Sequence, residues 1–210
     1  MPHPIFQKYR FRWLFASLVA FLILTPLAEY DLYGDFLLPL LFSLTMATAV
    51  YVAADSKVAL GVAIALAVPG VVLIWLHDPE LKTAPAMIGI AFTMALDLLV
   101  LSLVLVHIFK AEQVDAEILS GALAVYLLLA LTWSLLYYLI EALDPGSFNM
   151  PAGNKIPGFL YFSLTTLTTL GYGDITPASQ LTRSWAMLEA VTGVLYSAVM
   201  IARLVSMYRK

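Results

Sequence analysis

A short loop in the last third of the chain is built to present backbone oxygens. Residues 165–174 read TTLTTLGYGD and lie between two strongly apolar segments. Gly171 and Gly173 alternate with Leu170 and Tyr172, and an alternation of left- and right-handed backbone conformations points successive carbonyls the same way. Glycine reaches the left-handed conformation without steric cost. A ring of such carbonyls can replace the water shell of a monovalent cation.

We assign the ion-facing oxygens to the hydroxyl and carbonyl of Thr169 and to the carbonyls of Leu170, Gly171 and Tyr172, with Gly173 at the mouth. The side chains of Leu170 and Tyr172 are expected to point backward and brace the loop. A Gly-Tyr-Gly-Asp tetrapeptide alone is more typical of an ordinary turn between helices. The threonines directly before it, a short preceding helix and two flanking apolar segments favour the ion-binding interpretation.

The composition is that of an integral membrane protein. Hydrophobic residues make up 62% of the chain and charged residues 12%, against about a quarter charged in soluble domains. A net charge of -3 without a basic tract argues against nucleic acid as a partner. The chain has no cysteine, which excludes disulfides and thiolate metal sites, and we expect no cofactor beyond the bound ions.

Apolar runs predict six membrane spans, because about 20 apolar residues are needed to cross the hydrocarbon core. The expected spans are 13–28, 36–54, 58–76, 84–109, 118–140 and 184–206. The fold class is therefore an all-α membrane protein with both termini on one side. The first run is too long for a signal peptide and no small-x-small cleavage pattern follows it, although five spans with an external N-terminus would orient the loop equally well.

Lysine and arginine counts predict the orientation. With a cytoplasmic N-terminus, the inside carries eight basic residues, Lys8, Arg10, Arg12, Lys57, Lys110, Arg203, Arg209 and Lys210. The outside then carries three, Lys82, Lys155 and Arg183. Both termini are therefore expected in the cytoplasm, with the loop on the outer side.

The segment before the loop is expected to enter the membrane and stop. Pro145 and Gly146 end the fifth span, and Pro157 suits the first turn of a new helix. Residues 158–168 supply about three turns, too few to cross. Such a re-entrant helix is tolerated where protein or water surrounds it, and its C-terminal end directs partial negative charge at a cation.

Residues from about Ile118 to Tyr208 resemble the two-helix pore module of bacterial potassium channels. The resemblance rests on LLLALTWSLLYYLIEALDPGSF, FLYFSLTTLTTLGYGDITP and LEAVTGVLYSAVMIARLV. The signature T-x-x-T-x-G-Y-G-D is matched by Thr166, Thr169, Gly171, Tyr172, Gly173 and Asp174. The resemblance implies a K+ selectivity filter, a homotetramer in which each subunit gives one filter strand, contact with membrane lipids, and a bacterial inner membrane.

The resemblance also points to residues that support the filter. Where many relatives have a tryptophan that contacts the aspartate after the filter, this chain has Tyr161, whose hydroxyl could donate to Asp174. Where some relatives have a glutamate behind the filter, it has Thr165. Glu189, in the last span, either hydrogen-bonds the pore helix, which we favour, or lies near the outer interface without a special task.

Gly193 takes the position of the gating hinge in the resemblance, although close helix packing explains a glycine there equally well. Helical periodicity places Val194, Ser197, Ile201 and Val205 on one face. We expect this face to line the inner cavity, where a ring of Ile201 or Val205 side chains would close the pore by dewetting.

The expected organisation is a four-helix bundle over 1–110, a linker over 111–117 and a pore domain over 118–210. The bundle resembles the layout of a voltage sensor but lacks sensor arginines: residues 84–109 contain only Asp97 and His107 as ionisable groups. Asp97 is either a protonated acid bonded to a hydroxyl of Thr45, Thr48 or Tyr51, or a site for cations or protons. The short linker predicts that each bundle packs against its own pore.

The sequence thus predicts a passive potassium-selective channel without strong voltage gating. The alternative is a weakly selective monovalent cation channel. An intramembrane enzyme fits poorly, because Asp97 and Glu189 lie on separate modules and His107 stands alone. A secondary transporter would show repeated halves with broken helices, and the two halves here differ. No cytoplasmic ligand-binding domain is expected after Lys210.

Overall fold

Long apolar segments fold as helices because lipid offers no partners for free backbone groups. The computed structural model of the chain describes residues 9–29, 34–76, 83–151 and 155–208. Within these ranges six helices are long and apolar enough to cross a membrane. The protein is therefore an all-α, multi-pass membrane protein, as the sequence predicts. Lys8, Lys82, Arg209 and Lys210, which entered the orientation argument, lie outside the described residues.

Four of the long helices form the N-terminal bundle: α2 (Arg10–Leu24), α3 (Gly34–Val52), α4 (Lys57–Leu76) and α5 (Ala84–Lys110). The part that the sequence predicts to form a pore, called the pore part below, consists of α6 (Ala116–Leu143), the short α7 (Lys155–Leu167) and α8 (Gln180–Tyr208). Two short 3₁₀ turns, η1 (Thr25–Glu29) and η2 (Ala53–Asp55), extend α2 and α3. Strands β1 (Phe148–Asn149) and β2 (Thr176–Pro177) pair antiparallel beside the loop.

The first helix differs from the predicted span at both ends. It begins at Arg10 rather than at residue 13, and its α-helical part ends at Leu24 before the 3₁₀ turn η1. Hydropathy does not register charged residues that extend a helix beyond the apolar core. The early end follows from Pro26, which has no amide hydrogen to continue the α-helical ladder.

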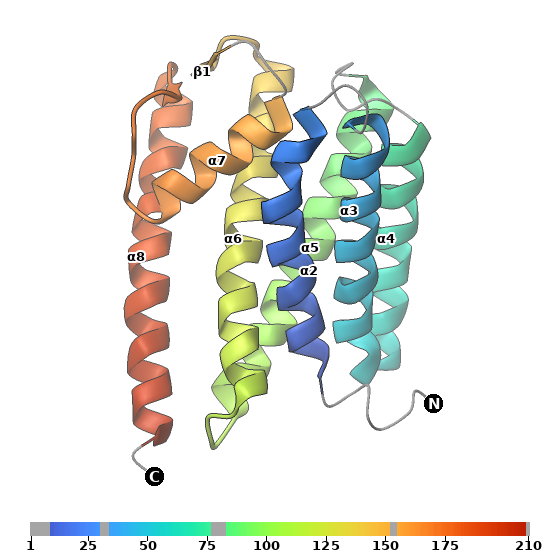
Figure 1. Cartoon of the computed structure of the whole chain (residues 1–210), viewed down its shortest axis with the longest axis vertical. Helices are drawn as coiled ribbons and strands as arrows, with labels where there is room; N and C mark the ends of the chain where they lie inside the picture. Colours follow the sequence, from blue (N-terminus) through green and yellow to red (C-terminus); the bar gives the residue numbers. More distant parts are fainter. Residues whose placement is uncertain (1–8, 30–33, 77–82, 152–154, 209–210) are drawn as a thin grey trace.

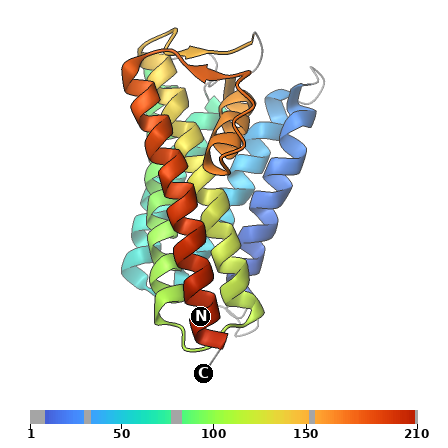
Figure 2. The same ribbon diagram turned by 90° about the vertical axis from the view of Figure 1, so that its left-hand side faces the viewer.

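The short helix α7 lies in the half of the molecule opposite to the start of α2 and the end of α8 (Figure 1). It packs against α6 and α8 of the same chain, and the rotated view shows α8 running the full height of the pore part (Figure 2). Helices α2 and α5 pack against α6. Within the single chain the bundle therefore packs against α6, and its packing in an assembly of several copies stays a prediction.

A polar cluster joins the bundle to the pore part at the end where the termini lie. Arg10 forms an ion pair with Asp55, and its guanidinium lies 3.2 Å from Nδ1 of His107. The backbone amide of Phe11 donates to Glu117 at 2.5 Å. These contacts link α2 to η2, α5 and the first turn of α6, so bundle and pore are fastened within one chain.

Candidate ion-binding loop

The loop after α7 has the alternating backbone that the two glycines predict. Gly171 has φ 51°, Gly173 has φ 81° and Thr169 has φ 60°. Leu170 and Tyr172, which lie between them, are outside the left-handed region. Three alternate positions are thus left-handed. A threonine there was not expected, because β-branched residues seldom adopt positive φ. Such a conformation persists only where the surroundings hold it.

The amides of the loop are bonded back to the last turn of α7. The carbonyl of Thr165 accepts from the amides of Leu170 and Gly171, at 2.8 and 3.0 Å, and the carbonyl of Thr166 accepts from the amide of Thr169 at 2.9 Å. The hydroxyl of Thr165 donates to the carbonyl of Phe162 at 3.0 Å. With their amides engaged in this way, the loop residues have their carbonyls available for an ion.

Tyr161, on α7, lies beside the loop. Its ring is stacked on that of Tyr172, with centroids 6.3 Å apart and planes at 1°. The pKa of Tyr161 is raised above its usual value, because its surroundings partly remove water from the hydroxyl and because the hydroxyl is hydrogen-bonded to Asp174. The contact between Tyr161 and Asp174 suggested by the sequence is therefore present; what it does for the filter stays a prediction.

Leu170 does not brace the loop within one chain. Its side chain is 57% exposed in the isolated chain, and that of Tyr172 is 68% exposed despite the stacking on Tyr161. The backward-facing arrangement expected from the sequence thus holds for the Tyr172 ring only. The Leu170 side chain leaves an apolar surface uncovered.

Glu189 connects the three helices of the pore part. It is fully buried on α8, and its Oε2 accepts from the hydroxyl of Tyr137 on α6 at 2.6 Å. Its Oε1 lies 2.5 Å from Oγ of Ser163 on α7. Glu189 therefore contacts the pore helix, as the favoured interpretation has it.

The protons around Glu189 can be counted from these contacts. Oγ of Ser163 also lies 2.7 Å from the carbonyl of Ala130, which can only accept. A hydroxyl has one proton, so Ser163 cannot donate both to this carbonyl and to a carboxylate. A protonated Glu189 that donates to Ser163 gives every group a partner, and so does an ionised Glu189 that accepts from Ser163 while the Ala130 carbonyl stays in the backbone ladder of α6. The protonated form avoids the expense of a charge at membrane depth.

Gly193 faces the C-terminal end of α7. A Cβ added at this glycine would lie 2.0 Å from the carbonyl oxygen of Leu167, a separation that no side chain tolerates. The same carbonyl accepts from the hydroxyl of Tyr126 on α6 at 3.3 Å. Close packing thus accounts for a glycine at this position, and the hinge role stays a prediction.

The predicted cavity face of α8 is largely uncovered in the single chain. Val194, Ile201 and Val205 are 54%, 63% and 48% exposed. Ser197 is half-buried, and its hydroxyl donates to the carbonyl of Gly193 at 3.0 Å. This face is available to water or to neighbouring copies, and its role in lining a cavity stays a prediction.

Asp97 lies buried on α5, and the hydroxyls proposed as its partners are engaged elsewhere or unpaired. Thr45 donates to the carbonyl of Phe42, and Thr48 donates to the carbonyl of Thr45. Among the residues that the structure describes, Oδ2 of Asp97 and the hydroxyl of Tyr51 have no hydrogen-bond partner. The structure therefore shows no hydrogen bond between Asp97 and any of these three hydroxyls, and the alternative role as a site for cations or protons stays a prediction.

Sequence reasoning missed the partners that hold the pore helices together. Tyr137 and Ser163 bind Glu189, and the Arg203 guanidinium donates to the carbonyls of Phe109 and Ala111 at 2.9 and 2.6 Å. The available signal was a polar side chain inside an apolar span, since such groups need partners in lipid. Which partner each takes depends on helix rotation, and periodicity alone does not fix that.

Comparisons with known proteins agree with this geometry. A family model described as "Ion channel" matches residues 125–210, which begin inside α6 and include α7, the loop and α8. The chain is 26% identical over 95 residues to "Two-pore potassium channel 2" of Arabidopsis thaliana, covering 45% of this chain and 21% of that protein. It is 34% identical over 64 residues to "Two pore potassium channel c" of Oryza sativa subsp. japonica, covering 30% and 14%. No solved structure matches.

Residues 125–210 are thus similar to an ion-channel family, and parts of the chain are similar to two potassium channels. The chain spans about a fifth or less of the length of these curated relatives.

Proposed function

We propose that the chain is one subunit of a potassium-selective channel that conducts K+ passively. The ion path is formed by the hydroxyl of Thr169 and the carbonyls from Thr169 to Tyr172, contributed by each of four copies around a central axis. The observation that carries the proposal is the left-handed backbone at Thr169, Gly171 and Gly173. Together with loop amides bonded back to α7, it supports oxygens directed at a common axis.

A tetramer is proposed because one chain carries a single loop, which cannot surround an ion. Symmetric rings are the usual way to complete such a site. The uncovered side chains of Leu170, Val194 and Ile201 are consistent with neighbours that pack beside the loop and around the inner helix. We place both termini in the cytoplasm and the loop outside, and the bacterial inner membrane is the expected location.

Gating is proposed to depend little on voltage. Helix α5 carries only Asp97, His107 and Lys110 as ionisable residues, and Asp97 is buried in the bundle. Each charge that crosses the field supplies about 2.3 kcal/mol per 100 mV, so steep gating needs several moving charges in every subunit.

Flux into liposomes tests the proposal and discriminates the weakly selective alternative. Protein in potassium-loaded liposomes is expected to take up rubidium, to exclude sodium and to be blocked by barium. Sodium uptake comparable with that of rubidium would favour the weakly selective channel, and no uptake of either ion would contradict conduction.

Two glycine variants provide a matched comparison. Gly146 and Gly171 both have positive φ, and an added Cβ would meet nothing within 4 Å at either. Neither Gly146→Ala nor Gly171→Ala therefore creates a steric clash, and both place an alanine at positive φ. We expect loss of rubidium uptake in Gly171→Ala alone, because only this glycine lies in the ion path.

A further inference from the structure

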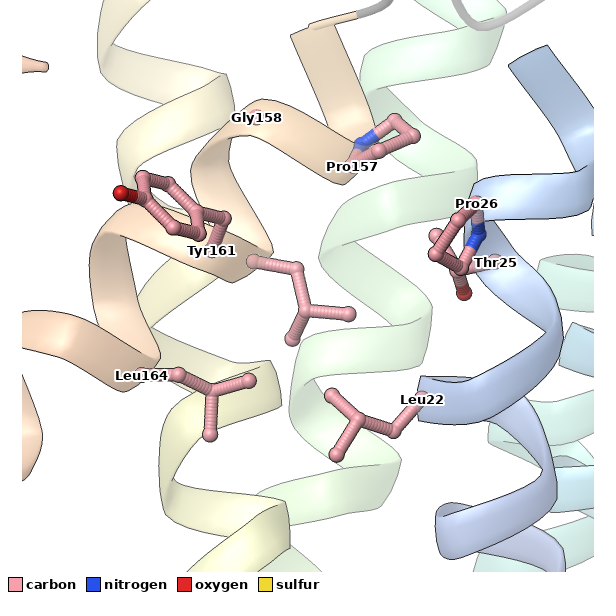
Figure 3. A pocket seen from close by; sticks show the side chains of 8 residues that line it. Leu22, Thr25, Pro26, Pro157, Gly158, Tyr161 and Leu164 are labelled. Carbon is pink, nitrogen blue, oxygen red and sulfur yellow. The ribbon is translucent and has the colours of Figure 1, made fainter. Parts of the chain in front are cut away.

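A cavity of about 430 Å³ separates the end of the first helix from the back of α7 (Figure 3). This volume falls within the range of about 300–1,000 Å³ typical of ligand pockets. Pro26, which ends the α-helical ladder of α2, and Pro157, in the first turn of α7, lie on its two sides. The cavity is lined by Leu22, Thr25, Pro26, Pro157, Gly158, Leu160, Tyr161 and Leu164.

Among the residues that the structure describes, the lining offers no free hydrogen-bonding side chain. Thr25 and Tyr161 are the polar members of the lining set. The hydroxyl of Thr25 donates to the carbonyl of Phe21 at 2.5 Å, and that of Tyr161 is hydrogen-bonded to Asp174. A buried water needs two to four polar partners, whereas apolar cavities take up apolar molecules. The occupant is therefore apolar.

The cavity is continuous with the lipid-facing surface of the bundle. Its neighbours Ile23 and Leu27 are 65% and 47% exposed, and Tyr161 in the wall is 37% exposed. Pro26 is exposed as well. Within the described part of the chain, the lining contains no charged residue that would bind a headgroup. Hydrocarbon from the bilayer is thus the matching chemistry, and it can enter between η1 and α7.

We propose that an acyl chain of a phospholipid, from the leaflet at the α7 end, occupies this cavity. It packs against Leu22 and Leu164 and supports the Tyr161 ring from behind. Because Tyr161 contacts both Tyr172 and Asp174, the lipid chain holds the loop in a fixed position relative to α7. The occupancy follows from the cavity alone, whereas its effect on ion flux rests on the proposed function.

Photo-crosslinking in liposomes tests the occupancy. The full chain is reconstituted in phosphatidylcholine whose acyl chain carries a diazirine, and labelled peptides are identified by mass spectrometry. We expect labels on Leu22, Leu160 and Leu164. Leu22→Trp fills the cavity and should abolish the labels on α7, whereas Ile23→Trp, at the exposed neighbouring position, should leave them unchanged.

The labelling pattern of the unaltered protein decides the matter even if Leu22→Trp does not fold. Labels confined to exposed residues such as Val62 and Val68 on α4, with none on the cavity walls, would overturn the inference. Protein–protein crosslinks at the cavity in place of lipid labels would also overturn it, because a neighbouring copy would then fill the space.

Rubidium uptake measured on the same liposomes separates this inference from the proposed function. If the cavity walls are labelled but no ion flux is found, the lipid site stands and the proposed channel function is contradicted. If both lipid labelling and rubidium uptake are found, we expect Leu22→Trp to change the rate at which rubidium uptake declines with time. Ile23→Trp should leave this rate unchanged.

Discussion

Replacing Glu189 by glutamine and by alanine tests how the pore helices are held together. A protonated Glu189 donates one hydrogen bond, to Ser163, and accepts one from Tyr137. The amide of Glu189→Gln reproduces both, because its NH₂ donates and its oxygen accepts. We therefore expect Glu189→Gln to assemble and conduct like the unaltered protein.

Alanine removes both contacts and leaves the Tyr137 hydroxyl without a partner among helices α6, α7 and α8. Ser163 keeps the carbonyl of Ala130 at 2.7 Å, so one group is orphaned. An orphaned buried donor costs about 1–3 kcal/mol, and the vacated volume adds a cavity term. For chains of 150–250 residues, about 2–4 °C of melting temperature is lost per kcal/mol. Glu189→Ala should therefore melt several degrees lower.

The assay is thermal unfolding in detergent together with rubidium uptake, with Val191→Ala as control on the exposed side of the same helix. Val191 is apolar and 54% exposed in the single chain, so this change removes no hydrogen bond and should have less effect than Glu189→Ala. Infrared spectroscopy should show a carbonyl band of a protonated carboxyl that disappears in Glu189→Gln. A glutamine variant as unstable as the alanine variant, with no such band, would refute the proton count.

Three further changes follow from the geometry. Tyr161→Phe removes the hydrogen bond at the filter mouth and should speed filter inactivation in single-channel records. The raised pKa of Tyr161 favours the neutral hydroxyl, so the unaltered protein should lose this support only as the pH rises above 10.0. If the same change at alkaline pH persists in the variant, Tyr161 is not its cause. Gly193→Ala forces α8 away from the Leu167 carbonyl, and this overpacking should cost about 1–3 kcal/mol of stability, which thermal unfolding detects. The control Gly61→Ala should be tolerated, because an added Cβ there meets nothing within 4 Å. Normal stability of Gly193→Ala with altered channel opening would favour the hinge role instead. Arg203→Gln loosens α8 from the end of α5 and should change open probability, and unaltered gating would show that this contact carries no coupling.

The number and order of the spans could be predicted from the sequence because lipid leaves the backbone few choices. The bounds were less accurate: Pro26 ends the α-helical ladder early, and Arg10 extends the first helix beyond the apolar run. The re-entrant helix followed from its length, and its observed start at Lys155 puts Pro157 in its first turn, as expected.

The loop could be predicted in part. Two glycines gave the left-handed positions 171 and 173, but nothing in a threonine predicts the same conformation at Thr169. Contacts between distant helices, such as that of Tyr137 with Glu189, depend on how each helix is rotated in the packed structure. A hydropathy pattern does not contain this rotation. For this reason the hydroxyls predicted as hydrogen-bond partners of Asp97 are not bonded to it in the structure.

The most direct test of the central claim is a structure of the protein in lipid with rubidium. Ion density is expected on a four-fold axis, level with the oxygens of Thr169, Leu170, Gly171 and Tyr172. A monomer, or a ring whose loop turns amide hydrogens toward the axis, would contradict the account.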